Sequence, residues 1–166
     1  MALAVPLSRF TSRVGGGSAF FVRPLHIIMK IPPVLSGVAG EYFVAAELSR
    51  RGYIASISLR NTRGIDILAT NQEASRSVTI QCNTRQKAGK SWMVSVKSED
   101  FIPADHFYVF VALGADTHRP IYHIVPSCDV AAQLKKSAEH KQVKHQVRHF
   151  IDLDGKYKER WDLLGL

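Results

Sequence analysis

Two short segments constrain the fold of this chain most strongly, because each alternates apolar and polar side chains. They are residues 64–69, GIDILA, and residues 78–84, VTIQCNT. Successive side chains of a strand point to opposite faces, so both segments are predicted to be strands with one apolar face. The apolar positions are Ile65, Ile67, Ala69, Val78, Ile80 and Cys82. Asp66, Gln81 and Asn83 lie on the opposite face, and they converge if the two strands are neighbours.

Upstream, residues 36–51 are predicted to form a helix, with Ser36 as its N-cap and Gly52 as its stop. Glu41 precedes the apolar residues by helical spacings and so falls on their stripe, which includes Val44, Ala45 and Leu48. The polar side carries Glu47, Arg50 and Arg51. Glu41 is open to two interpretations: a first-turn acid favoured by the helix dipole, or a functional carboxylate. Beside Asp66 and Gln81 we prefer the functional one.

This order of elements and side chains resembles the PD-(D/E)XK nuclease superfamily, which has the restriction-endonuclease-like fold. The family pattern is G-x-x-x-E on a helix, then G-x-D, then (E/Q)-x-K and a small hydroxyl residue. Here the matching segments are Gly37–Glu41, Gly64–Asp66 and Gln81–Thr84. The likeness covers about residues 36–130. It is closest to small bacterial members of unassigned function, and more distant to archaeal Holliday-junction resolvases.

The resemblance implies an α/β fold of the αβββαβ type, with a central mixed sheet flanked by helices. It implies Mg²⁺-dependent (or Mn²⁺-dependent) DNA cleavage, in which Asp66 and Gln81 bind the metal and Glu41 assists. Hard cations prefer oxygen ligands such as these. The catalytic set implied is Glu41, Asp66, Gln81 and Asn83.

Asn83 departs from the family pattern, which has lysine at this position. Losing one stabiliser of transition-state charge typically costs ~10²–10³ in rate. Three nearby cations, Arg85, Lys87 and Lys90, follow in a basic loop, and the sequence does not show whether any reaches the site. Two rivals to an endonuclease therefore stay open: a non-catalytic module that binds DNA or a protein, and a structural subunit of a larger nuclease assembly.

The formal net charge of +8 makes DNA the leading candidate partner. The densest basic stretch is residues 135–149, which as a helix would carry a stripe containing Lys141, Lys144 and Arg148. A solvated helix face explains this stretch equally well. The other residues assigned to nucleic-acid binding are Arg63, Arg85, Lys87 and Lys90.

Further strands are predicted near residues 53–59, 106–113 and 120–125, with a helix from about 127 and a packing helix at the C-terminus. The nearly continuous apolar run Phe107–Val111 is typical of a central strand buried on both faces. Trp92 is open to stacking on a base or to packing in the core, and the core is the commoner place for tryptophan.

The organisation expected is one domain over residues 36–166, ending in a basic helical region, after an extension over residues 1–35 that is disordered or non-native. The extension has no acidic residue, which is typical of transit peptides, but its glycine run favours a start-site artefact or a tail. With two cysteines and no apolar run of bilayer length, we expect a cytoplasmic protein without a membrane segment. A homodimer is compatible with the sequence. A thiol site pairing Cys128 with His123 is disfavoured, because no third partner appears.

Overall fold

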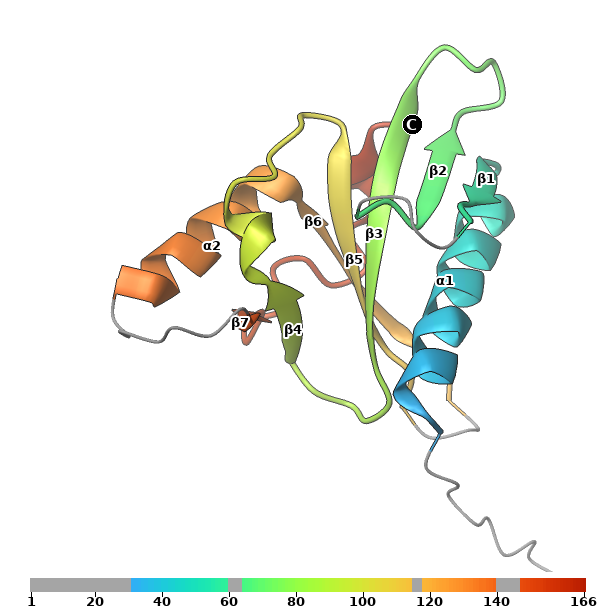
Figure 1. Ribbon diagram of the computed structural model, residues 1–166. Coiled ribbons are helices and arrows are strands. Elements are labelled where there is room, and N and C mark those ends of the chain that lie inside the picture. The colour runs from blue at the N-terminus through green and yellow to red at the C-terminus, as the bar shows by residue number, and fades with distance from the viewer. Residues whose placement is uncertain (1–30, 60–63, 115–117, 140–146) are drawn as a thin grey trace, which may run out of the picture.

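The computed structural model describes residues 31–59, 64–114, 118–139 and 147–166 (Figure 1). The predictions at Arg63, Lys141 and Lys144, and those for residues 1–30, lie outside these ranges. The elements in chain order are α1 (Pro33–Arg50), β1 (Ile54–Ile57), β2 (Ile67–Thr70), β3 (Ser77–Arg85), β4 (Ser91–Ser95), the 3₁₀ helix η1 (Val96–Glu99), β5 (His106–Ala112), β6 (Ile121–Pro126), α2 (Ser127–Glu139), β7 (Val147–Ile151) and the 3₁₀ helix η2 (Trp161–Leu164).

A five-stranded mixed sheet forms the centre of the molecule, in the order β1-β2-β3-β5-β6. Only β3 and β5 are parallel among its neighbouring pairs. The connection between these two strands passes through β4 and η1, and β4 pairs with β7 in a separate antiparallel ribbon. The predicted α/β class with a central mixed sheet is confirmed.

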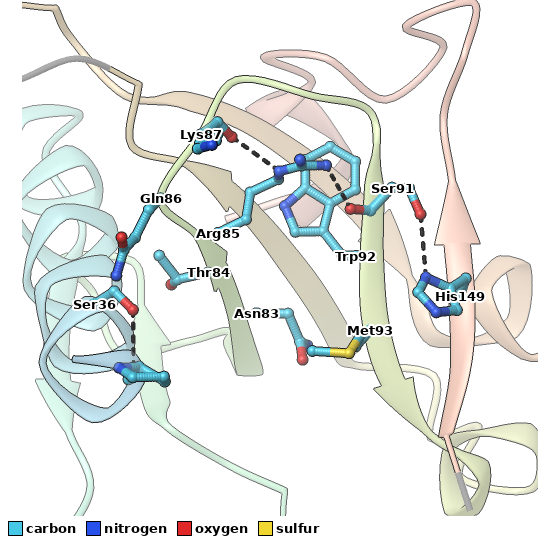
Figure 2. A pocket seen from close by; sticks show the side chains of 11 residues that line it. Ser36, Asn83, Thr84, Arg85, Gln86, Lys87, Ser91, Trp92, Met93 and His149 are labelled. Atoms are coloured by element: carbon cyan, nitrogen blue, oxygen red, sulfur yellow. Dashed lines mark hydrogen bonds between the residues drawn. The ribbon is translucent and has the colours of Figure 1, made fainter. Parts of the chain in front are cut away.

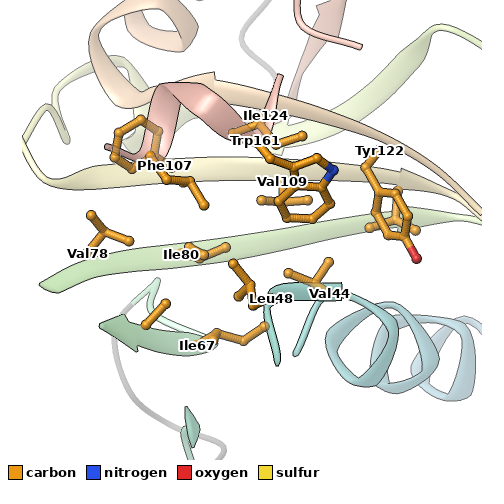
Figure 3. Close-up of a cluster of buried hydrophobic side chains, with 13 residues drawn as sticks. Val44, Leu48, Ile67, Val78, Ile80, Phe107, Val109, Tyr122, Ile124 and Trp161 are labelled. Atoms are coloured by element: carbon orange, nitrogen blue, oxygen red, sulfur yellow. The ribbon is translucent and has the colours of Figure 1, made fainter. Parts of the chain in front are cut away.

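Each face of the sheet has its own hydrophobic core, and Figure 3 shows the first of the two. The first core joins β2, β3, β5 and β6 to α1 and η2, through Val44, Leu48 and Trp161 among others. The second joins β5 and β6 to α2 and the β4–β7 ribbon. All seven residues of β5 are buried, because the strand lies between the two cores. The prediction of a central strand at this position is confirmed.

Helix α1 begins earlier than predicted. Pro33 occupies the first helical turn, where a missing N–H costs nothing, and the capping position is Pro32 without a side-chain cap. Ser36 is therefore inside the helix, where its hydroxyl donates to the carbonyl of Pro33 at 2.9 Å. The predicted stop is correct, since Gly52 has φ +88°, a left-handed conformation that glycine adopts readily.

The basic helix predicted over residues 135–149 is wrong at its C-terminal end. Helix α2 ends at Glu139, and residues 147–151 form β7, which pairs with β4. Pairing with a strand more than fifty residues away overrides the local helical spacing of charges, as tertiary context often does. The predicted packing helix at the C-terminus is the short η2, in which Trp161 and Leu164 are buried. No helix within the described ranges combines the length and apolarity required to cross a bilayer.

The helical spacing predicts Glu47 on the polar side of α1, but the structure buries it. Its carboxylate accepts hydrogen bonds from Arg50, Arg51 and Arg119, the last from the segment between β5 and β6. Burial alone would raise the pKa of Glu47, but these bonds and the Arg119 charge outweigh it and lower the pKa. The side chain thus ties α1 to the connection between β5 and β6.

Candidate functional site

Asp66 and Gln81 lie side by side, as the alternation of their segments predicts. Asp66 immediately precedes β2, and the pairing of Ile67 with Ile80 continues through a bond from the Asp66 N–H to the Ile80 carbonyl at 2.8 Å. Asp66 therefore stands opposite Gln81 on β3. Asn83 is two residues further along and shares the Gln81 face, where both alternate with the apolar positions of the first core.

The carboxyl group of Asp66 is partly buried and held by the backbone of β3. Its Oδ2 accepts a hydrogen bond from the Cys82 N–H at 2.7 Å. Burial raises the pKa of Asp66, and this hydrogen bond lowers it by less, so the net shift is upward. The Oδ1 atom accepts no hydrogen bond from the described part of the chain, which leaves it available as a ligand.

Glu41 reaches the same region from α1. Burial raises the pKa of the Cys82 thiol well above its usual value, and the charges of Asp66 and Glu41 raise it further. Both carboxylates therefore lie within electrostatic reach of one buried side chain on β3. Two nearby negative charges with an adjacent amide oxygen at Gln81 are a donor set that suits a hard cation.

The glycine that sets the distance between α1 and β3 is Gly40 rather than Gly37. A Cβ atom on Gly40 would overlap the hydroxyl of Thr84, whereas one on Gly37 would meet nothing within 4 Å. The close approach at Gly40 places its neighbour Glu41 over β3. Gly37 is the glycine of the G-x-x-x-E pattern, but it has no comparable packing role.

A pocket of about 620 Å³ opens at Gln81. It is lined by Gly64, Gln81, Ser95, Lys97, Ser98, Phe101 and Tyr108. Gly64 takes a positive φ of +63°, and a Cβ there would sit 3.5 Å from Gln81 Oε1. Sequence analysis missed Lys97, because it missed β4, which carries the chain to this pocket. The short apolar run Trp92–Val94 between Ser91 and Ser95 was the available signal for that strand.

A second pocket of about 620 Å³ lies beyond Asn83, at the C-terminal end of β3 (Figure 2). Its lining residues are Pro33, Ser36, Asn83, Thr84, Arg85, Gln86, Lys87, Ser91, Trp92, Met93 and His149. The Asn83 amide nitrogen and the Thr84 hydroxyl are buried here without a hydrogen-bond partner in the described chain. Trp92 itself is 2% exposed and donates its indole N–H to the Val111 carbonyl, so it belongs to the core.

Both pockets are lined by residues of β3 and of β4. Gln81 and Ser95 line the first, and Asn83 and Met93 line the second. Strand β4 pairs with β7 and not with β3, and the two strands diverge from the loop that joins them (Figure 1). One side-chain bridge spans them, from Arg85 Nη1 to the Ser91 carbonyl at 2.8 Å. We call this space the β3–β4 groove.

The structure places the residues predicted to bind nucleic acid in different surroundings. Arg85 and Lys87 line the second pocket, although the Arg85 guanidinium is also bonded to the Lys87 and Ser91 carbonyls. Lys90 donates to the Leu153 carbonyl. Arg148 forms an ion pair with Glu99, with Nε 2.6 Å from Oε1. The structure therefore does not bring Lys90 or Arg148 to either pocket.

The donor set at Asp66 fits a divalent ion that keeps several water ligands. Within the described ranges, no group of three or more His, Cys, Asp or Glu side chains is placed to hold a metal. A site here would instead use the Asp66 carboxylate and the Gln81 amide oxygen, with Glu41 at longer range. Mg²⁺ is commonly held by one or two carboxylates and by substrate phosphates, with water in the remaining positions.

Comparison with solved structures finds two nucleases with a similar arrangement of elements. One is a Holliday junction resolvase from the archaeon Archaeoglobus fulgidus, with 13% identity over 70% of this chain and 84% of that chain, and a TM-score of 0.44. Another is the bacterial homing endonuclease I-Ssp6803I, with 15% identity over 80% of this chain and 91% of that one, and a TM-score of 0.48. No family model and no curated protein matches the sequence. Similarity at this level carries no argument about chemistry, so the function has to be inferred from the side chains.

Proposed function

We propose that this protein is a divalent-metal-dependent DNA endonuclease of the PD-(D/E)XK type. The observation that carries the proposal is the position of Asp66 beside Gln81 of β3: its N–H donates to the Ile80 carbonyl, and its Oδ2 accepts from the Cys82 N–H. Asp66 and Gln81 would hold Mg²⁺ or Mn²⁺, and Glu41 would assist from α1. The bound metal supplies an activated water and stabilises charge on the phosphoryl group.

The chain's own residues have separate roles in this proposal. The Cys82 N–H fixes the orientation of the Asp66 carboxylate through its bond to Oδ2. Asn83 donates a hydrogen bond from its amide to the DNA strand but carries no charge and accepts no proton. Arg85 and Lys87 contact phosphates along the second pocket.

Calorimetric titration of Mg²⁺ and of Mn²⁺ tests the metal site. We expect saturable binding by the wild type and by Asp154→Ala, whose exposed carboxylate is outside both pockets, but none by Asp66→Ala. Because the pKa of Asp66 is raised, protons should weaken binding at a higher pH than for an ordinary aspartate. Equal binding by wild type and Asp66→Ala would disprove the site.

A non-catalytic module that binds DNA is the second candidate, and Asn83 is the observation that favours it. Cleavage of linear, branched and single-stranded DNA by wild type and Asn83→Lys separates the two. Metal-dependent cleavage by the wild type establishes the endonuclease. Tight DNA binding by both proteins, with cleavage by neither, establishes the module.

A further inference from the structure

The candidate site has two carboxylates and a neutral residue where its resemblance leads us to expect a lysine. Cleavage of a phosphodiester builds up negative charge on the phosphoryl group, and a fixed cation near that charge stabilises the transition state. Asn83 is neutral and does not supply this cation. A cation that compensates for Asn83 therefore has to line the same space as Gln81.

The cations next to Asn83 in sequence do not line the pocket that contains Gln81. Arg85 is bonded to the Lys87 and Ser91 carbonyls, and Lys90 to the Leu153 carbonyl. Lys87 lines the second pocket, which does not include Gln81. Lys97 alone among the described cations lines the pocket with Gln81.

The ammonium group of Lys97 is free to meet a ligand. It forms no hydrogen bond and no ion pair within the described ranges. An unpaired ammonium that shares a pocket with the amide oxygen of Gln81 is a favourable place for a phosphate oxygen. Lys97 and Gln81 therefore contribute to this pocket from two different elements, η1 and β3.

The backbone that carries Lys97 is held firmly at several points. Its N–H donates to the Ser95 hydroxyl at 3.3 Å, and its carbonyl accepts from the Asp100 N–H at 3.4 Å. Two residues on, Glu99 is bound to Arg148 of β7. The adjacent Ser98 is buried, at 4% exposure. A cation on a fixed element loses less entropy on meeting its ligand than one on a free loop.

We propose that Lys97 is the phosphate-facing cation of this site, presented by η1 across the β3–β4 groove in place of the lysine absent at position 83. Its ammonium donates hydrogen bonds to the non-bridging oxygens of a phosphodiester that lies between β3 and β4. The inference rests on the proposed nuclease function and identifies the residue that compensates for Asn83.

Single-turnover cleavage of labelled DNA by five proteins tests the role of Lys97. The proteins are the wild type, Lys97→Ala, Lys97→Arg, Lys158→Ala, and the double variant Asn83→Lys with Lys97→Ala. Lys158 is exposed and outside both pockets, so Lys158→Ala matches the loss of one charge. We expect Lys97→Ala to slow cleavage by ~10²–10³, and Lys158→Ala to stay within about twofold of wild type.

Rescue separates a direct role from a structural one. Lys97→Arg keeps the charge and should recover part of the rate. The double variant should recover more than Lys97→Ala, because residue 83 shares the Gln81 face and a lysine there restores a cation. DNA affinity, measured by fluorescence anisotropy, should fall less than tenfold in Lys97→Ala, and its unfolding midpoint should not change.

The outcomes distinguish failure of this inference from failure of the nuclease proposal. An active wild type with Lys97→Ala no slower than Lys158→Ala overturns the role of Lys97 and leaves the endonuclease standing. A slow Lys97→Ala that neither Lys97→Arg nor the added lysine at position 83 improves also overturns it. A wild type that cleaves no DNA with either metal overturns both.

Discussion

At Gly40, the absence of one methyl group decides how closely α1 approaches the sheet. The Thr84 hydroxyl occupies the space where a Cβ would lie, so any larger residue must push α1 away from β3. Glu41 is the next residue, and its approach to Cys82 depends on this contact. The packing of Gly40 and the position of Glu41 are therefore coupled, because the two residues are adjacent.

We expect Gly40→Ala to lower the free energy of unfolding by about 1–3 kcal/mol, because overpacking forces a shift of the helix. Denaturation in urea measures the change. Gly37→Ala is the matched control in the same helix. Since nothing lies within 4 Å of a Cβ there, it should raise stability by about 0.5–1 kcal/mol through helix propensity.

Thr84→Ala removes the atom that Gly40→Ala would strike first. The alanine at position 40 should therefore cost less in a Thr84→Ala background than in the wild type. Equal costs in both backgrounds would show that Thr84 does not set the distance between α1 and β3.

At the scale of the element, β5 carries a histidine into a strand buried on both faces. His106 is 0% exposed, and its Nδ1 lies 2.9 Å from the Thr79 hydroxyl, while its Nε2 has no partner in the described chain. Burial lowers the pKa of His106 from 6.5 to about 4. The strand therefore holds the imidazole neutral, packed against Phe101 and Tyr108.

This predicts a specific loss of stability in acid. Between pH 6.5 and 4 the unfolded chain binds a proton at His106 that the folded chain does not, so stability falls as pH falls through this window. The loss in the free energy of unfolding reaches about 3 kcal/mol at pH 4, the lower end of this window. His106→Phe should remove it, as unfolding in urea at pH 7.5, 5.5 and 4.5 will measure.

Other groups that titrate between pH 6.5 and 4 affect the stability of the wild type and of His106→Phe alike. The comparison of the two proteins therefore isolates the effect of His106. The difference in unfolding free energy between wild type and His106→Phe should change with pH. A difference that is constant from pH 7.5 to 4.5 would contradict a neutral buried histidine.

At the scale of the whole molecule, a buried pair fastens the C-terminal segment to the sheet. His123 of β6 and Asp152 after β7 are 3% and 4% exposed, and His123 Nδ1 lies 2.6 Å from Asp152 Oδ2. Asp152 also accepts the N–H groups of Lys156 and Tyr157. These bonds direct the chain back along β6 to η2, which completes the first core. They also engage His123, which leaves no thiol site with the exposed Cys128.

Asp152→Ala should therefore lower the free energy of unfolding by about 3–5 kcal/mol, because it leaves buried donors without their acceptor. Asp154→Ala removes an exposed carboxylate two residues away and should change stability by less than about 0.5 kcal/mol. Thermal and urea denaturation measure both. Similar values for the two variants would show that the buried pair does not hold the C-terminal segment.

Local patterns in the sequence were sufficient to predict the parts of this protein that depend on neighbouring residues. The alternation of segments 64–69 and 78–84 was sufficient to predict that Asp66 meets Gln81, because a strand has only two faces. The continuous apolar run of β5 and the proline and glycine at the ends of α1 are local signals of the same kind. The extension, the homodimer and the individual catalytic roles stay predictions.

Contacts between distant segments, in contrast, became visible only in the folded chain. Strand β7 exists because it pairs with β4, although its basic residues fit a helical stripe equally well. Glu47 is buried because Arg119 arrives from between β5 and β6. Lys97 faces Gln81 because β3 and β4 stand apart across a groove. Contacts of this kind depend on the paths of separate segments through space, which no periodicity within either segment encodes.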